Sequence, residues 1–262
     1  MLNLHLCRTF QRMDEDKQNI IDLFNQHVKG KVPDTISAEA KHAGKEGHWL
    51  EEQMGVARNA SNSPDLFGYE MKNATGSKTT FGDWSADFYI WNDNTYRIQR
   101  DDFLQIFGKS NLKKGGRFSW SGEPVPKINQ YNTFGQILLI DRDQNIIIEY
   151  SHSRDHRPDK ASIVPTIMQQ EHLLLARWDC ESIKQKVERK FNQKGWFKCQ
   201  RDESGTYTEI VFGAPITFEQ WLADVKKGQI IFDSGMYQTN TRNYSQWRAV
   251  NSYWENLITD RH

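Results

Sequence analysis

Cysteine and long apolar runs are both scarce in this sequence. The three cysteines are Cys7, Cys180 and Cys199, and no two of them form a CxxC pair. A disulfide framework or a structural zinc site is therefore not expected. The N-terminal segment Met1–Phe10 has no long apolar stretch, and no run of about 18 apolar residues follows it. We expect a protein of a reducing, cytoplasmic compartment that has no membrane partner.

An excess of charge of one sign is also missing. The 34 basic and 34 acidic residues give a formal net charge of +0. The total therefore does not favour a nucleic-acid-binding protein, and any basic face has to be local. A hydrophobic content of 37% in 262 residues is enough for one large domain or two closely joined lobes. The 9 tryptophans are expected to be core anchors.

Hydrophobic periodicity and turn residues predict a mixture of helices and strands with no clear linker. Helices are predicted at residues 15–28, 38–54, 100–107, 181–192 and 217–227. Strands are predicted at 66–71, 79–91 with a bend, 135–140 and 145–150 as a hairpin, 207–212 and 229–233. Residues 111–127, 151–158 and 234–248 are predicted to be loops. The fold class is therefore α/β or α+β.

The most informative segment is Pro64–Lys72, with the sequence PDLFGYEMK. On a strand, residues two apart face the same side, so Glu70 and Lys72 project together. Asp65 lies in the preceding turn and can fold back beside Glu70. Two adjacent carboxylates repel each other unless a cation lies between them, and oxygen-rich sites of this kind suit Mg²⁺. A metal there would activate water, and Lys72 would stabilise developing charge.

The acidic-x-Lys pattern alone is weak, because the sequence contains it four times. Three copies, Glu15–Lys17, Glu188–Lys190 and Asp224–Lys226, fall in predicted helices, where residues two apart do not face each other. Only Glu70–Lys72 lies in a predicted strand with Pro-Asp just upstream. The alternative for this pair is an ordinary solvated strand end.

The segment Gly47–Gly55, followed by Pro64-Asp65 and Glu70-x-Lys72, resembles the MutH mismatch-repair nicking endonuclease. It is closer still to the MutH-like restriction endonucleases of the MvaI and BcnI type, in the PD-(D/E)XK nuclease superfamily. The resemblance implies an acidic residue from the preceding helix, and the matching position is Glu51. It also implies a second active-site lysine further along the chain. Lys113, Lys114 and Arg117 are candidates without a clear match.

The resemblance further implies an α/β fold of the PD-(D/E)XK type, with a mixed central sheet and two lobes around DNA. Residues 1–150 would be mainly catalytic, and residues 151–262 mainly concerned with recognition. The implied activity is that of a type II restriction endonuclease cutting double-stranded DNA at a short specific sequence, with Mg²⁺ held by Asp65, Glu70 and Met71. The implied products carry 5′-phosphate ends. The implied setting is a prokaryotic cytoplasm, with a monomer or a dimer and a cognate methyltransferase that acts on the same site without needing to bind.

Three polar segments are candidate DNA contacts, each with a solvated surface as its alternative. Lys and Arg would contact phosphates whatever the sequence, whereas Arg, Asn and Gln can also read base edges. The phosphate candidates are Lys109, Lys113, Lys114, Arg117, Arg154 and Arg157. The base-reading candidates are Gln238, Asn240, Arg242, Asn243, Gln246 and Arg248, in the position of the family's recognition segment.

Two other functions compete with a restriction enzyme. One is a repair nickase of the MutH type, which shares the active-site chemistry. The other is a DNA-binding module with a decayed catalytic centre, which the intact Asp65, Glu70 and Lys72 disfavour. A nucleotide-binding P-loop at Gly108-Lys109-Ser110 is excluded, because the glycine that the pattern requires is Phe103. The sequence identifies neither the recognition site nor the cut position.

Overall fold

The computed structural model describes residues 2–34, 45–56, 62–73 and 76–262, with the backbone alone for residues 2–14 and 45. The chain forms two compact units. The first consists of residues 1–79, 186–218 and 250–262, and the second of residues 80–185 and 219–249. Because the chain passes from one unit to the other several times, the units do not coincide with lobes divided at residue 150. No helix in the described ranges is long and apolar enough to cross a membrane.

The first unit is built on a four-stranded sheet in the order β1-β9-β10-β14. Its strands are β1 (Glu70–Lys72), β9 (Trp196–Arg201), β10 (Tyr207–Gly213) and β14 (Ile258–Arg261). β1 runs parallel to β9, whereas β10 is antiparallel to both β9 and β14. The helices of this unit are α1 (Leu2–His27), α2 (Lys45–Gln53), α7 (Asn251–Glu255) and the C-terminal part of α5 (Cys180–Phe191).

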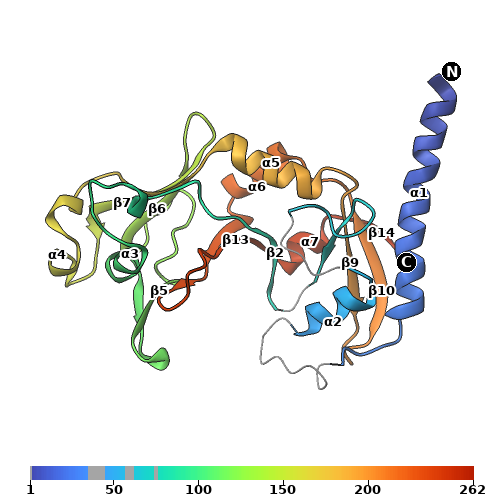
Figure 1. The fold of residues 1–262 in the computed structure, drawn as a ribbon, viewed down its shortest axis with the longest axis horizontal. Helices are drawn as coiled ribbons and strands as arrows, with labels where there is room; N and C mark the ends of the chain where they lie inside the picture. The colour runs from blue at the N-terminus through green and yellow to red at the C-terminus, as the bar shows by residue number, and fades with distance from the viewer. Residues whose placement is uncertain (1, 35–44, 57–61, 74–75) are drawn as a thin grey trace. The chain divides into compact units, whose positions relative to one another are not determined.

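The two faces of this sheet have different partners. Side chains that alternate with Glu70 and Lys72, including Met71, Phe197 and Phe212, share a hydrophobic core with Phe24 of α1. Figure 1 shows α1 running along β10 and β14. Glu70, Lys72 and Lys198 occupy the alternate positions and therefore face the other side. The alternation thus separates an apolar core face from a polar face.

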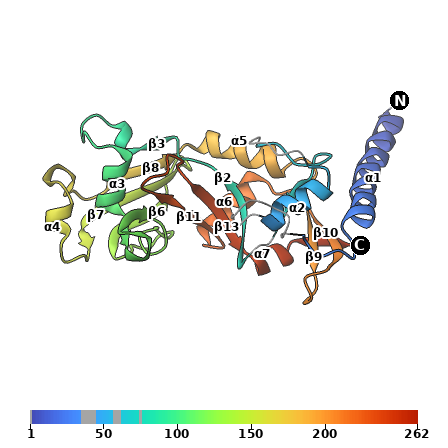
Figure 2. The same ribbon diagram turned by 60° about the horizontal axis from the view of Figure 1, so that its bottom comes forward.

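The second unit contains three sheets and most of the aromatic core. A sheet in the order β3-β8-β7-β6 consists of β3 (Phe88–Tyr89), β8 (Leu173–Trp178), β7 (Ile146–Asp155) and β6 (Phe134–Ile140). A second, β12-β5-β4, consists of β12 (Met236–Tyr237), β5 (Arg117–Trp120) and β4 (Lys109–Asn111). A third, β11-β13-β2, consists of β11 (Ile230–Ser234), β13 (Ser245–Val250) and β2 (Lys78–Asp83). Figure 2 shows β11 beside β13, its antiparallel partner.

Short helices complete the second unit: α3 (Arg100–Phe107), α4 (Lys160–Ile163), α6 (Phe218–Lys226), and the 3-10 turns η1 (Ile90–Asn92), η2 (Leu112–Lys114) and η3 (Thr166–Met168). Trp247 packs against three other aromatic rings at centroid distances of 5.2–5.5 Å, which are those of Trp178, Trp221 and Phe232. The expectation that tryptophans are core anchors is confirmed for seven of the nine, whereas Trp49 and Trp91 are only partly buried.

The mixed α/β class and the hairpin are confirmed, since β6 and β7 pair antiparallel. Three local predictions were wrong. Residues 66–69 form a tight turn instead of a strand, because Phe67 and Gly68 have φ values of 48° and 85°. Residues 111–127 are not one long loop, because Gly115 and Gly116, at 69° and 78°, reverse the chain between β4 and β5. The loop predicted at 151–158 is partly strand, because β7 continues to Asp155.

Two helix predictions differ from the structure in their limits. The helix predicted at residues 15–28 is α1 and begins at Leu2. Of the helix predicted at 38–54, the structure describes α2 from Lys45, and the preceding residues lie outside the described ranges. The segment predicted as a recognition loop also contains β12 and most of β13.

Candidate active site

The turn before β1 places Asp65 next to the catalytic strand. The backbone of Leu66 exchanges two hydrogen bonds with that of Tyr69, at 3.0 and 2.8 Å, and this closes a two-residue turn over Phe67 and Gly68. The chain doubles back, and Oδ2 of Asp65 accepts a 2.9 Å hydrogen bond from the backbone N–H of Met71. The fold-back expected for Asp65 is therefore present. Gly68 suits this turn because a left-handed φ costs little without a Cβ atom.

Glu70 and Lys72 lie buried on the polar face of β1, with exposed fractions of 3% and 5%. Nζ of Lys72 donates a 2.8 Å hydrogen bond to Oε1 of Glu70. The rings of Phe191 and Trp254 lie 4.8 and 5.8 Å from this ammonium. β1 is fixed by its parallel pairing with β9, in which Glu70 is opposite Trp196. The two side chains that the strand pattern predicted to project together therefore do so.

A second lysine reaches the same carboxylate from α5. Nζ of Lys190 is 3.1 Å from Oε1 of Glu70, the oxygen that Lys72 also contacts. Sequence reasoning missed Lys190, because its acidic-x-Lys pattern lies in a helix and was set aside for that reason. Glu188 and Lys190 do lie in a helix, as predicted, but this helix brings Lys190 to Glu70. Lys198 lies on the same face of the sheet, opposite Lys72 in the parallel pairing.

The electrostatics of the site centre on its two carboxylates. Burial and the neighbouring Glu70 raise the pKa of Asp65 to about 6, against the lowering effects of Lys72, the Met71 amide and Lys190. Burial also lowers the pKa of Lys72, while Glu70 raises it. The two carboxylates face the two ammonium groups of Lys72 and Lys190, yet burial still disfavours the charged form of Asp65.

One carboxylate oxygen of the site could bind a further ligand. Oε2 of Glu70 is buried and has no hydrogen-bond partner, although both lysines contact Oε1. A buried carboxylate oxygen without a partner is costly, and a bound cation would satisfy it. No group of three or more His, Cys, Asp or Glu side chains able to hold a metal occurs in the described ranges. A metal would therefore need backbone oxygen and water ligands beside Asp65 and Glu70, which is the ligand set that Mg²⁺ commonly accepts.

Glu51 lies on α2, where its carboxylate is 3.1 Å from Nδ1 of His48. It is half-buried, whereas the neighbouring Glu52 is exposed. In the described ranges, this contact with His48 joins Glu51 to its own helix rather than to Asp65 or Glu70. Its catalytic role therefore stays a prediction.

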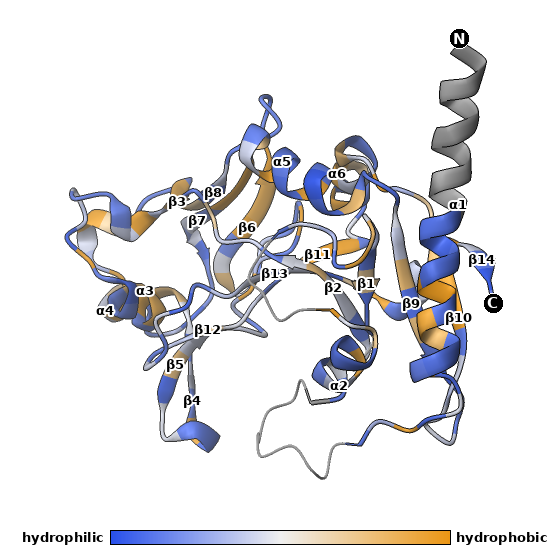
Figure 3. Ribbon diagram, turned by 45° about the vertical axis from the view of Figure 1, so that its right-hand side comes forward, coloured by the Kyte–Doolittle hydropathy of each residue, from blue (hydrophilic) through white to orange (hydrophobic). Residues whose placement is uncertain are grey.

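Four of the candidate phosphate contacts lie in one hairpin of the second unit, Lys109, Lys113, Lys114 and Arg117. Figure 3 shows this hairpin, formed by β4 and β5, with a hydrophilic tip. Lys113 and Lys114 are exposed in η2. Lys109 is 2.5 Å from the carboxylate of Glu123. The guanidinium of Arg117 lies 3.8 Å from the centre of the Tyr237 ring. Lys113 and Lys114 are therefore more available for phosphate contact than Lys109 or Arg117.

The other two candidate phosphate contacts differ in availability. Arg154 is exposed on β7. Arg157 is 11% exposed, and its guanidinium contacts the Asp155 carboxylate at 2.7 Å and the Ile106 carbonyl at 2.8 Å. Arg157 is thus part of the internal structure of the second unit.

Several candidate base-reading side chains also have partners within the second unit. Oε1 of Gln238 accepts from the backbone of Phe118, Asn240 donates to the Tyr237 hydroxyl, and Oδ1 of Asn243 accepts from Arg100. Arg242 has a 62% exposed side chain and pairs with Asp83 at 2.8 Å, whereas Arg248 pairs with Asp233 at 3.1 Å and is 27% exposed. Gln246 is half-buried on β13. Arg242 is therefore the most accessible arginine of this segment.

The mixed α/β fold is of the PD-(D/E)XK type, and the class of protein is that of the restriction endonucleases. Residues 28–262 match the family described as LlaMI restriction endonuclease, and the chain belongs to that family. The chain is 47% identical to the type II restriction enzyme ScrFI of Lactococcus lactis subsp. cremoris, over 95% of this chain and 100% of that protein. The resemblance inferred from the sequence is confirmed.

A solved structure shares the fold. The chain matches the restriction endonuclease MvaI, solved as a complex with its cognate DNA substrate, with a TM-score of 0.60 and 13% identity. The match covers 95% of this chain and 97% of that chain. The likeness therefore extends over both compact units.

Proposed function

We propose that this protein is a type II restriction endonuclease that hydrolyses phosphodiester bonds of double-stranded DNA with Mg²⁺, leaving 5′-phosphate and 3′-hydroxyl ends. The observation that carries the metal assignment is the buried Oε2 of Glu70, which has no hydrogen-bond partner and lies beside an Asp65 carboxyl of raised pKa. Family membership supports the DNA substrate. A bacterial cytoplasm, where such DNA is found, fits this role.

Asp65 and Glu70 would hold the metal, with the backbone carbonyl of Met71 as a third protein oxygen. When bound, Mg²⁺ lowers the pKa of coordinated water and neutralises charge on the phosphodiester. The 2.9 Å hydrogen bond from the Met71 amide fixes Oδ2 of Asp65, which limits rotation of this carboxylate. Burial of Glu70 excludes competing water from its oxygens. The chain therefore supplies a preorganised pair of acidic ligands.

Lys72 would orient the attacking water and stabilise charge in the transition state. Its ammonium is buried and held by Glu70, so its position is fixed before substrate arrives. Lys190 contacts the same carboxylate oxygen and is therefore our first candidate for the second active-site lysine, ahead of Lys113, Lys114 and Arg117. Lys198, opposite Lys72 on the neighbouring strand, is the second candidate.

The test is cleavage of a plasmid of known sequence with Mg²⁺, followed by sequencing of the ends. The purified protein should convert the plasmid to defined fragments with 5′-phosphates, and chelation of the metal should stop the reaction. Asp65→Ala and Glu70→Ala should abolish cleavage while DNA binding persists, because removal of a carboxylate lowers its repulsion of phosphate. Substantial Mg²⁺-dependent cleavage by both variants would rule out this site. Asp143→Ala, a change of an exposed carboxylate in the β6–β7 turn, is the control and should cleave normally.

A further inference from the structure

A polar cavity of about 500 Å³ lies next to the catalytic strand in the first unit. Asn73, which directly follows Lys72, lines it together with residues 198–203 of β9 and the following turn and Glu255 of α7. Lys198 is opposite Lys72 in the parallel pairing and shares its face of the sheet, whereas Arg201 alternates with Lys198 on β9 and lies against the Tyr207 ring and Glu46 of α2, so the cavity surrounds the C-terminal end of β9. Neighbouring strands are about 4.8 Å apart, so the cavity begins beside the active site.

Two cations line the cavity, and each is held by an acidic side chain more exposed than itself. Nζ of Lys198 is 2.7 Å from Glu255, with side-chain exposures of 9% and 37%. Arg201 is 2.9 Å from Glu46, with exposures of 24% and 41%. Ion pairs with a solvated partner contribute little stability, so a stronger anion can replace the carboxylate. A phosphate is such an anion, because it accepts two parallel hydrogen bonds from a guanidinium.

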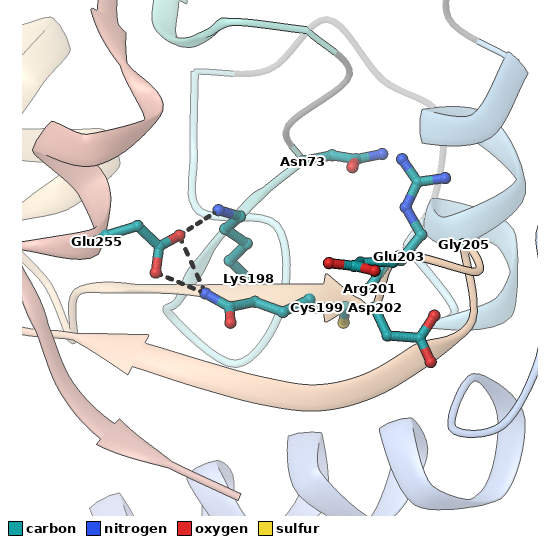
Figure 4. A pocket seen from close by; sticks show the side chains of 9 residues that line it. Asn73, Lys198, Cys199, Arg201, Asp202, Glu203, Gly205 and Glu255 are labelled. Atoms are coloured by element: carbon teal, nitrogen blue, oxygen red, sulfur yellow. Dashed lines mark hydrogen bonds and ion pairs between the residues drawn. The ribbon is translucent and has the colours of Figure 1, made fainter.

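One buried hydrogen-bond donor of the cavity has no acceptor, and it lies beside the Arg201 guanidinium. Figure 4 shows the Arg201 guanidinium and the Asn73 amide directed toward each other, while Lys198 is directed toward Glu255. Nδ2 of Asn73 is buried and has no acceptor. The Asp202 carboxylate does not compensate, because it accepts hydrogen bonds from Ser204 and Thr206 in its own turn. The cavity therefore holds a buried donor without an acceptor, Asn73, beside a guanidinium whose present partner is the partly exposed Glu46.

We propose that this cavity binds a backbone phosphate of the DNA strand, next to the phosphate that is hydrolysed. Arg201 makes the main contact, and Asn73 adds a neutral donor. In the free protein, Glu46 forms an ion pair with the Arg201 guanidinium. The site acts in binding and alignment, so its loss weakens the complex more than the chemical step. This inference rests on the proposed function, since the DNA strand that reaches Glu70 and Lys72 must also pass the C-terminal end of β9.

The test is a phosphate-by-phosphate comparison of Arg201→Gln with the unaltered full-length protein. Duplexes carrying the site found by end sequencing receive one neutral methylphosphonate at a time around the cut. Binding is measured with Ca²⁺ in place of Mg²⁺. The unaltered protein should lose roughly tenfold in affinity at one position beside the cleaved bond, the scale of one charged hydrogen-bond contact. Arg201→Gln should bind natural DNA roughly tenfold more weakly and lose nothing further at that position.

Two further variants sharpen the result. Arg142→Gln, a change of an exposed arginine in the β6–β7 turn, should keep the full methylphosphonate profile of the unaltered protein. Glu46→Gln frees Arg201 from its internal partner and should bind natural DNA several-fold more tightly. The proposal is overturned if Arg201→Gln retains the full loss at every position, or if Glu46→Gln leaves binding unchanged. A parallel plasmid assay separates the two hypotheses, because absence of cleavage by the unaltered protein would refute the proposed function instead.

Discussion

Replacement of Asp65 by Asn should stabilise the metal-free protein at neutral and alkaline pH. The pKa of Asp65 is raised from 3.8 to about 6 by burial and by Glu70, so its charged form is disfavoured in the folded state. An Asn side chain keeps an oxygen that can accept the hydrogen bond from Met71 N–H but carries no charge. The substitution therefore removes the electrostatic penalty and preserves the geometry.

The sign of the pH dependence follows from proton linkage. Between about pH 4 and pH 6 the folded protein retains a proton on Asp65 that the unfolded chain has lost, so stability falls as pH rises through this window. Above about pH 6 the penalty is complete, and below about pH 4 it vanishes. A rise of about two pKa units corresponds to an upper limit of roughly 3 kcal/mol. With roughly 2–4 °C of melting temperature per kcal/mol for a chain of this size, Asp65→Asn should melt several degrees higher at pH 8.

The assay is thermal unfolding in a chelator at pH 4, 6 and 8, with the variant compared to the unaltered protein at each pH. Asp202→Asn is the matched control, because hydrogen bonds from Ser204 lower the pKa of Asp202. Loss of the Asp202 charge should not raise the melting temperature at any of these pH values. If Asp65→Asn melts no higher than the unaltered protein at pH 8, then Asp65 is not held in an unfavourable charged state and the electrostatic reasoning is wrong.

Three other predictions concern activity and binding. Lys72→Ala should lower the single-turnover cleavage rate by about two orders of magnitude, the scale of losing one preorganised charge; a near-normal rate would make Lys72 a structural residue. Glu51→Gln should impair cleavage strongly and Glu52→Gln should not, since neighbours on a helix point about 100° apart. The reverse result in the same assay would mean that Glu52, not Glu51, is the acidic residue that the helix contributes. In binding assays over several salt concentrations, Arg242→Ala should narrow the gap between cognate and scrambled duplexes, whereas Lys113→Ala should weaken both and flatten the salt dependence. If Arg242→Ala still discriminates fully between cognate and scrambled duplexes, Arg242 does not read bases.

The local part of the active site could be predicted from the sequence because it depends on strand alternation. Glu70 and Lys72 face one side of β1, as any residues two apart on a strand do, and Met71 is buried in the core on the other side. The position of Asp65 could also be predicted, because Pro and Gly flank a short segment that must turn. The turn itself was misassigned as strand, since Leu66, Phe67 and Tyr69 resemble strand residues and the left-handed φ of Phe67 leaves no mark in the sequence.

Nonlocal partners could not be predicted in the same way. Lys190 reaches Glu70 only because β1 pairs in parallel with β9, and a parallel pair needs a long crossover connection. Here that connection includes residues 80–185, the larger part of the second unit, so no short-range pattern joins Glu70 to the lysine. Arg117 has a partner that the sequence also did not predict. Its charge suggested a phosphate contact, but its guanidinium lies against the Tyr237 ring.

The charge balance of the chain has a related explanation. A net charge of +0 did not favour a DNA-binding protein, but the candidate contacts Arg201, Arg242 and Lys109 each lie against a carboxylate of their own unit. Such pairs neutralise the total without removing the cations, because a partly solvated carboxylate holds its partner weakly. Phosphates that displace these carboxylates would gain a positioned cation and release condensed counterions from the DNA. Neutral composition is therefore compatible with a DNA-binding face whose cations are held by internal acids until the substrate arrives, which is the arrangement that Glu46→Gln tests directly.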